Sequence, residues 1–451
     1  MTTARSINKW FILVSLLLVS TGYLVRETNQ KNGTVAEVRI DASVTYQVMD
    51  GFGSSQRLFD DPHLIGGPDN SYDRTKGLIM TPAQQDEILD RLYVDLGFTR
   101  VRPGIYPVEL EPMNDNADPE VTDLSKFFFE WKRNDGFFDY VSRARARGLT
   151  TWWLSPGNLE PWMTEANPKE YVEWAMVVIR RWRDNGLELP YYSIMNEPGY
   201  KRSGTWSGEY IRNVIKLLGP KLQAEGINTK IVVPDDLNAT QAYQRSRIIL
   251  ADPDARQYVK ALAFHLYDEP ITNAIKMKRL SEQYGISLWM TEYSQGDPFT
   301  WANTMHALIS NYSVSAVDYM FGFSGGRDLI TLEHDGSRYL GYERNKHYYV
   351  MGQFSRFVTP GSRRIKADTN DRAIKVTAYK DGQNLVAVAI NNAYTEKKVH
   401  FDLKGITGIR EVEPIRTSKT ENWEVLARIP VVGSTFTTAL PPGSITTFLA
   451  H

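Results

Sequence analysis

Two short segments of the sequence each place a glutamate at the end of an apolar, β-rich run. Residues 192–198 read Tyr-Ser-Ile-Met-Asn-Glu-Pro, and residues 288–293 read Leu-Trp-Met-Thr-Glu-Tyr. Pro198 cannot donate a backbone hydrogen bond, so the first strand is expected to stop there. Hydrolysis of a glycosidic bond needs two carboxyl groups, one to protonate the leaving oxygen and one to attack or stabilise the sugar. The spacing therefore predicts a two-carboxylate site built from Glu197 and Glu292.

The elements that must position these glutamates alternate between strand-like and helix-like patterns from residue 51 to residue 357. Such alternation predicts parallel β–α units, and eight units over roughly 300 residues match a (β/α)8 barrel with both glutamates at its catalytic end. A doubly wound open sheet would give the same alternation, but no glycine-rich nucleotide loop follows the first strand. The predicted strands lie at 48–52, 99–103, 150–154, 191–195, 230–233, 261–265, 287–291 and 316–321, and the predicted helices at 82–96, 135–146, 168–184, 208–224, 271–284 and 300–310.

After Pro360 and Gly361 the chain changes to short, β-branched, closely spaced runs separated by turn signals such as Asp381-Gly382. This pattern predicts an antiparallel β-sandwich at 358–451. The strand-like runs at 38–40 and 44–48 have no role in the barrel, so residues 36–50 are expected to join the sandwich. The expected fold class is α/β, with a (β/α)8 TIM barrel at 51–357 and a C-terminal antiparallel β-sandwich side domain that also takes N-terminal strands.

The composition of the 451-residue chain narrows its function. A net charge of −1 gives no bulk attraction to nucleic acid or anionic lipid, so nucleic acid is not expected as a partner. The absence of cysteine excludes a catalytic thiol, a disulfide framework and a thiolate metal site. His265, His306, His334 and His347 lie in separate segments without a His-Glu-x-x-His string, so no metal site is expected either.

The N-terminus has the order of an export signal. Arg5 and Lys9 precede the apolar run at 10–19, and small or polar residues follow it at 20–22. Residues 1–25 are therefore expected to be a signal peptide cleaved near Gly22. The alternative is an uncleaved signal anchor, because residues 10–25 approach the length of a membrane span. A cleaved signal implies a secreted or periplasmic protein without stable membrane association.

Six strings, in this order along the chain, resemble glycoside hydrolase family 30 of the retaining clan A (β/α)8 hydrolases. The resemblance implies that Glu197 is the general acid and then the general base, and that Glu292 is the nucleophile that forms a glycosyl-enzyme intermediate. Retention requires the two carboxyls to be about 5–5.5 Å apart, with Glu197 protonated at rest and Glu292 ionised. The strings are 48–53 (VMDGFG), 155–156 (SP) with 161–163 (PWM), 196–198 (NEP), 291–293 (TEY), 347–355 (HYYVMGQFS) and 442–448 (PGSITTF).

Polar residues at the strand ends are candidates for binding the sugar or the glutamates. Asn196, beside the acid, would hydrogen-bond the sugar 2-hydroxyl. Arg102 would donate to the nucleophile or to a substrate carboxylate, and Arg100, which points the same way by strand alternation, competes with it for this role. A structural ion pair is the alternative for either arginine.

The sixth predicted barrel strand ends with His265 and Tyr267 on one face, and both are candidates for binding the substrate. Tyr267, or Tyr293 after the seventh strand, would hold the nucleophile, and core packing is the alternative for these side chains.

Aromatic residues near the strand ends are candidates for stacking on sugar rings. Trp153 and Trp162 are the expected platforms. Many hydrolases of this clan carry a tryptophan on the last barrel strand, but here that strand has none, so Phe321 or Phe323 is the expected substitute. A long insertion at 60–74 also departs from the family's short turn and leaves the substrate open.

The sequence thus predicts a retaining β-glycosidase that acts on a polysaccharide or its oligosaccharides, of the xylan, β-1,6-galactan or β-1,6-glucan type. No cofactor is expected, because an acid, a nucleophile and water suffice. The arginines near the barrel mouth suggest an acidic sugar. Two alternatives stay open: a catalytically silent carbohydrate-binding protein on the same scaffold, and an inverting enzyme in which Asp235 or Asp297 acts as base at a carboxyl separation of about 6.5–9.5 Å.

Overall fold

The computed structural model describes residues 35–66, 76–105, 110–129, 133–157, 159–200, 206–324 and 328–450. Its centre is a closed barrel of parallel strands in which each strand pairs with the next and the last pairs with the first, as predicted. The strands are β2 (Gly51–Gln56), β3 (Arg100–Ile105), β4 (Thr151–Pro156), β5 (Tyr191–Ser193), β6 (Lys230–Asp236), β7 (Val259–His265), β8 (Ser287–Glu292) and β9 (Ala316–Met320).

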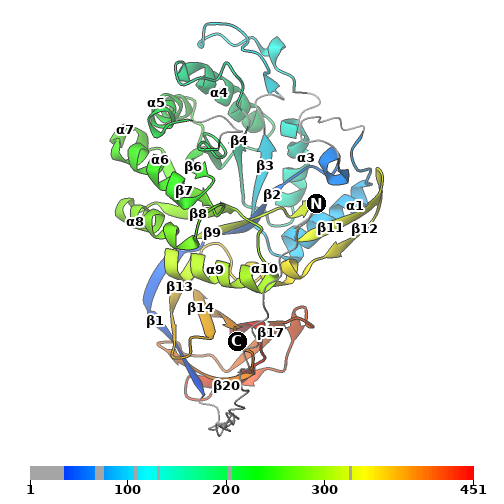
Figure 1. Ribbon diagram of the computed structural model, residues 1–451, viewed down its shortest axis with the longest axis vertical. Helices are drawn as coiled ribbons and strands as arrows, with labels where there is room; N and C mark the ends of the chain where they lie inside the picture. The colour runs from blue at the N-terminus through cyan, green and yellow to red at the C-terminus, as the bar shows by residue number, and fades with distance from the viewer. Residues whose placement is uncertain are drawn as a thin grey trace, which may run out of the picture. The chain divides into compact units, whose positions relative to one another are not determined.

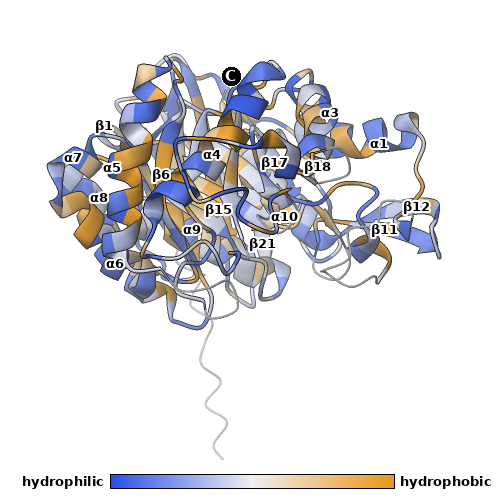
Figure 2. Cartoon of the chain, turned by 90° about the horizontal axis from the view of Figure 1, so that it is seen from above, coloured by the Kyte–Doolittle hydropathy of each residue, from blue (hydrophilic) through white to orange (hydrophobic). Residues whose placement is uncertain are grey.

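Helices surround the barrel strands (Figure 1). The helices carry hydrophobic and hydrophilic residues on the same element (Figure 2). In α5 (Gly208–Ala224), for example, the buried residues recur every three or four positions, which is the helical period. The helices are α1 (Pro82–Leu89), α3 (Arg133–Arg145), α4 (Pro168–Asp184), α5 (Gly208–Ala224), α6 (Ala239–Ala251), α7 (Pro253–Arg256), α8 (Ala274–Tyr284), α9 (Pro298–Tyr312) and α10 (Lys346–Ser355).

Several elements differ from the prediction. The first barrel strand begins at Gly51 rather than at residue 48, and the single helix expected at 82–96 is α1 followed by a π-helical segment, Asp90–Asp95. The helices α6 and α7 were not predicted. A three-stranded sheet after the barrel was also missed; it contains β10 (Phe323–Ser324), β11 (Ile330–Asp335) and β12 (Arg338–Arg344).

Residues before and after the barrel share one ten-stranded sheet, in the order β18-β17-β21-β15-β14-β13-β1-β16-β20, with β19 beside β17. The N-terminal runs form one strand, β1, which has register shifts after Asp41 and pairs antiparallel with β13 but parallel with β16. The sheet is therefore mostly, not wholly, antiparallel. Its strands are β1 (Ala36–Val48), β13 (Arg363–Thr369), β14 (Ile374–Asp381), β15 (Asn384–Asn391), β16 (Lys397–Lys404), β17 (Glu411–Thr417), β18 (Glu424–Val425), β19 (Ile429–Pro430), β20 (Thr435–Leu440) and β21 (Ser444–Ala450).

The ten-stranded sheet folds over on itself to form the predicted side domain. Phe448 on β21 packs with Phe401 on β16 and Phe436 on β20, at ring distances of 5.2 and 5.4 Å. Because these strands lie far apart in the sheet order, the two halves must face each other around a second apolar core.

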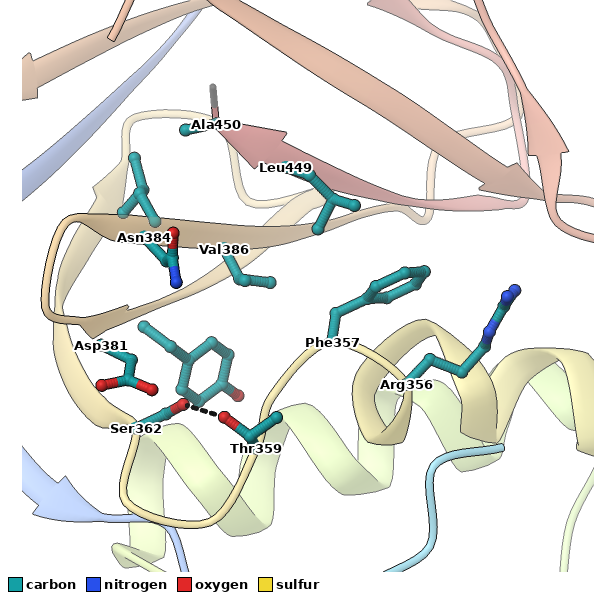
Figure 3. Close-up of a pocket in the computed structure, with 11 residues that line it drawn as sticks. Arg356, Phe357, Thr359, Ser362, Asp381, Asn384, Val386, Leu449 and Ala450 are labelled. Carbon is teal, nitrogen blue, oxygen red and sulfur yellow. Dashed lines mark hydrogen bonds between the residues drawn. The ribbon is translucent and has the colours of Figure 1, made fainter. Parts of the chain in front are cut away.

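Hydrogen bonds join the sandwich to the barrel through α9 and α10. Gln353 donates to Thr417 over 2.8 Å, and Asn303 and Asn392 exchange two bonds of 2.8 Å. A pocket of about 300 Å³ lies where the end of α10 meets the sandwich (Figure 3). Its lining includes Arg356 and Phe357 but neither Glu197 nor Glu292. These contacts attach the side domain to two helices of the barrel.

The predicted export signal at 1–25 lies outside the described residues. Across the described ranges, the helices are all too short or too polar to span a bilayer.

Candidate active site

Inward-pointing side chains fill the barrel interior at different heights, here called the lower and the upper layer. In the lower layer Arg100 on β3 bonds Asp318 on β9 through two hydrogen bonds of 3.0 and 2.9 Å and lies 4.1 Å from the ring of Trp289. Arg102 is two residues further along β3 and points the same way, about 6.6 Å nearer the carboxyl end of the strands. Arg102 belongs to the upper layer, where the two glutamates lie.

Glu197 follows β5 and has a backbone φ of 51°, in the left-handed region that few non-glycine residues adopt. Two backbone hydrogen bonds hold this conformation: the N–H of Glu197 donates to the carbonyl of Asp235 over 2.8 Å, and the carbonyl of Glu197 accepts from Tyr200 over 2.9 Å. The residue is only 8% exposed, and its Oε1 atom lies 2.9 Å from Nδ1 of His265. The local backbone therefore aims this carboxyl into the upper layer.

Glu292 is the last residue of β8 and is 6% exposed. Its Oε2 atom accepts a hydrogen bond from Nη2 of Arg102, and its Oε1 atom accepts one from the hydroxyl of Tyr267 over 3.1 Å. Burial and the charge of Glu292 raise the pKa of Tyr267 well above its usual range, so this hydroxyl keeps its proton and donates it. Two donors thus bond the two oxygens of Glu292 and fix their orientation.

The two glutamates converge on one point. One oxygen of Glu197, one oxygen of Glu292 and a ring nitrogen of His265 all lie within 4.8 Å of one another. Three such groups can bind a metal ion, but here Arg102 already bonds Glu292, and a protonated His265 would repel a cation. The spacing instead suits two carboxyls that act on one sugar carbon from opposite sides.

Asp235, at the end of β6, is linked to Glu292 through Arg102 and to Glu197 through His265. This structural role was not predicted from the sequence. The side chain of Asp235 has no exposed surface, and its φ is 58°. The carboxylate accepts from Thr291 and Ser155 over 2.5 Å each and from Nη1 of Arg102 over 3.2 Å, while Nε2 of His265 lies 3.3 Å away.

These donors keep Asp235 ionised. Although burial opposes it, the charge of Arg102 and the hydrogen bond from His265 hold the pKa of Asp235 well below its usual range. The sequence contains no signal for this role, because the donors come from four other strands or strand ends.

His265 is the last residue of β7 and is fully buried between the two acids. Burial alone would lower the pKa of His265, but the charge of Glu292 and hydrogen bonds to Asp235 and Glu197 raise it to about 10. Both ring nitrogens are engaged by protein groups, so His265 contacts the carboxyls and not a bound sugar. The expectation that His265 binds substrate is therefore wrong.

Arg102 is also committed to protein groups. Its guanidinium donates to Ser55 over 3.0 Å and to Asn196 over 2.5 Å, in addition to Glu292 and Asp235. Asn196 is partly exposed and accepts this bond through Oδ1, so its amide N–H groups remain available to a ligand.

The two predicted tryptophan platforms differ in burial. Trp153 has no exposed surface and packs against Trp289 in the lower layer at a ring distance of 6.1 Å. A sugar cannot reach it, so its predicted platform role is wrong; it is part of the barrel core. Trp162 is partly exposed, and its indole N–H donates to the carbonyl of Glu111 over 3.2 Å, which fixes the ring in the loop after β4.

Phe321, Phe323 and Tyr293, which follow the last two barrel strands, also differ in how far they are buried. Phe323 is fully buried and stacks on Phe59 at 4.6 Å, whereas Phe321 is partly exposed, with the guanidinium carbon of Arg57 4.9 Å from its ring. Phe321 is therefore the candidate sugar contact of the pair. Tyr293 is partly exposed, and its ring packs 5.8 Å from that of Tyr267.

The structure argues against the proposed inverting bases. Asp235 is fully buried and its oxygens are occupied by donors, so it cannot activate a water molecule on a sugar. Asp297 caps the N-terminus of α9, where it accepts from the N–H groups of Phe299 and Thr300 over 3.0 and 3.2 Å.

Comparison with known proteins found relatives among polysaccharide-degrading enzymes. The chain is 28% identical to the glucuronoxylanase XynC of Bacillus subtilis (strain 168) over 279 residues, which cover 60% of this chain and 63% of that protein. It is 24% identical to an endo-1,6-β-D-glucanase of Aspergillus fumigatus over 255 residues, which cover 51% of this chain and 49% of that protein. The matched segment thus spans less than two thirds of each of these relatives.

Solved structures share the whole described architecture. A family 30 glycoside hydrolase endoxylanase from Clostridium papyrosolvens C71 superposes with a TM-score of 0.72 at 23% identity, covering 92% of this chain and 100% of that chain. At this identity the likeness establishes the fold. No protein-family model matches the chain.

Proposed function

Because the sequence relatives and the shared fold support assignment of this chain to glycoside hydrolase family 30, we propose that it is a retaining glycosidase that cleaves β-glycosidic bonds in a polysaccharide or its oligosaccharides. The observation that carries the proposal is the convergence of Glu197 and Glu292, whose oxygens approach within 4.8 Å at the carboxyl end of the barrel strands.

In the first step, Glu292 attacks the anomeric carbon and Glu197 protonates the departing oxygen. Arg102 and Tyr267 donate hydrogen bonds to Glu292 and orient its two oxygens. The attack forms a glycosyl-enzyme ester on Glu292, and the bond to the leaving sugar breaks as its oxygen takes the proton.

In the second step, Glu197 takes a proton from water, which then attacks the same carbon and displaces Glu292. Two displacements at one carbon retain its configuration. Asn196, beside Glu197, supplies amide donors for the sugar 2-hydroxyl, while Trp162 and Phe321 supply partly exposed rings for stacking.

A β-linked glycan is the proposed substrate class. Arg100 and Arg102 were the basis for expecting an acidic sugar, but both are buried in bonds to protein carboxylates. Neither is free to bind a substrate uronate. The relatives that act on xylan and on β-1,6-glucan make those two polymers the first to test.

Product analysis after incubation with glucuronoxylan, unsubstituted xylan, β-1,6-glucan and β-1,6-galactan tests the proposal. At least one polymer should be cleaved, and the variants Glu197→Gln and Glu292→Gln should lose that activity. Glu170→Gln is the matched control, because Glu170 is an equally buried glutamate on α4. Binding to a polymer without cleavage of any would instead support a silent carbohydrate-binding protein.

The signal-like residues 10–22 support a secreted or periplasmic location for this protein. N-terminal sequencing of the protein from culture medium and from cells would test whether export and cleavage occur.

A further inference from the structure

The upper layer of the barrel holds more negative than positive charge around His265. The titratable groups that face this imidazole are Glu197 after β5, Asp235 and Asp236 on β6, Tyr267 after β7 and Glu292 on β8. Arg102 bonds Asp235 and Glu292, and Arg245 bonds Asp236 over 2.7 Å. Among the residues that the structure describes, four carboxyls and two guanidiniums leave this buried cluster with a net charge of −2, so at least one further proton is strongly favoured there.

His265 is the only imidazole in contact with this cluster among the described residues. Its Nε2 atom faces the permanent anion of Asp235 at 3.3 Å, so that nitrogen must carry hydrogen and donate it. Its Nδ1 atom lies 2.9 Å from Oε1 of Glu197. A second proton can therefore lie on Nδ1, as an imidazolium beside a carboxylate, or on Glu197, as a neutral imidazole beside a carboxylic acid.

Asp235 also shapes the position of Glu197. Its backbone carbonyl accepts the Glu197 N–H over 2.8 Å, which supports the left-handed conformation of that residue. The bonds from Ser155 and Thr291 fix the orientation of the Asp235 carboxylate, so the imidazole can approach it in one way.

We propose that Asp235 is a positioning residue that fixes hydrogen on Nε2 of His265, so that Nδ1 of His265 and the carboxyl of Glu197 share the proton delivered to the leaving oxygen. The proposal rests on the proposed function of Glu197 as the acid, and it deepens that function by naming where the acid's proton is stored. The pKa of His265, raised to about 10, agrees with this geometry.

The proton balance of the reaction follows. As Glu292 bonds to the anomeric carbon and the glycosidic bond breaks, Glu197 gives a proton to the leaving oxygen. If that proton rests on Nδ1, it crosses the 2.9 Å contact and leaves a neutral imidazole that still donates from Nε2 to Asp235. When water attacks in the second step, its proton returns to the pair, which restores the starting state.

Titration of His265 by NMR tests the proposal without a substrate, so its outcome is separate from the test of cleavage. The whole protein is labelled with ¹³C at histidine Cε1, and the His265 signal is assigned by its loss in His265→Gln. In the unsubstituted protein this signal should keep an imidazolium or partly imidazolium shift well above pH 8, because the shared proton lies on Nδ1 for at least part of the time. In Asp235→Asn the midpoint should fall by at least about one pH unit, because the charge that holds the Nε2 proton is gone.

Three further variants make the outcome decisive. Asp235→Glu keeps the charge and should restore most of the midpoint. Asp318→Asn removes an equally buried aspartate from the lower layer, bonded to Arg100, and should leave the midpoint unchanged even though it destabilises the fold. Asp235→Ser provides a second neutral variant if Asp235→Asn does not fold. A midpoint near the ordinary histidine value in the unsubstituted protein, or one that neither neutral variant moves, overturns the proposal.

Discussion

Arg100 and Arg102 lie two residues apart on β3 and form ion pairs in different layers of the barrel. Arg100 pairs with Asp318 in the core, whereas Arg102 pairs with Glu292 and Asp235 at the mouth. One strand thus supplies a structural cation and an active-site cation from the same face.

Replacement of Arg102 by alanine should strongly destabilise the protein as well as abolish activity. The change leaves Glu292 and Asp235 buried without their cation, which costs about 3–5 kcal/mol in the free energy of unfolding. Urea unfolding measures this loss. The control is Arg39→Ala, which breaks an exposed pair with Asp402 and should cost no more than about 1 kcal/mol. Equal losses of the free energy of unfolding in the two variants would contradict the burial of the Arg102 ion pairs.

Replacement of Tyr267 by phenylalanine should lower kcat far more than it changes KM. The variant keeps the ring but removes the hydrogen bond to Oε1 of Glu292, and a bond to a charged group contributes about 1.5–3 kcal/mol, or about 10–100-fold in rate. Steady-state kinetics on the substrate found in the panel gives both constants. Tyr93→Phe, which removes a buried bond to Tyr140, should leave kcat unchanged.

Trp153 and Trp162 should respond differently to alanine. Trp153→Ala empties a fully buried site and should lower the free energy of unfolding by about 3–5 kcal/mol. Trp162→Ala removes a partly exposed ring and should mainly raise KM or weaken glycan binding. Thermal unfolding measures the loss of stability, and steady-state kinetics measures the change in KM. An unaltered KM in Trp162→Ala would show that Trp162 does not belong to the proposed binding surface.

Stability should fall in alkaline solution in a way that depends on His265. Its folded-state pKa of about 10 lies above the ordinary histidine pKa of 6.5, so protonation stabilises the fold fully below about pH 6.5, and this contribution is lost as the pH rises through 10. The free energy of unfolding, measured between pH 6.5 and 10, should decline more steeply in the unsubstituted protein than in His265→Gln. Parallel curves would show that His265 carries no raised pKa.

Parts of the fold with strong local signals could be predicted from the sequence. The bounds of α4 and α5 agree with the prediction because Pro168 begins one helix, the Ser207 side chain caps the other, and an apolar stripe runs through both. The helix α6 was missed although Asn238 caps it, because its apolar pattern is weak. The β11–β12 hairpin is largely exposed, so it lacks the alternation that marks a half-buried strand.

The candidate site could be predicted only in part. Each glutamate was found because it follows an apolar strand, which is a local pattern. Depth within the barrel is not local: alternation places Arg100 and Arg102 on one face but does not say which reaches the mouth, and it cannot distinguish a buried Trp153 from an exposed ring. Asp235 was undetectable as the shared anchor because its partners are distant in sequence.

The anomeric configuration of the first product tests the central claim most directly. ¹H NMR, recorded within minutes of adding the protein to a cleavable β-glycan, distinguishes the β-anomer from the α-anomer before mutarotation mixes them. Attack by Glu292 followed by water predicts that the β-anomer appears first. Initial release of the α-anomer would mean a single displacement by water and would contradict the roles assigned to Glu197 and Glu292.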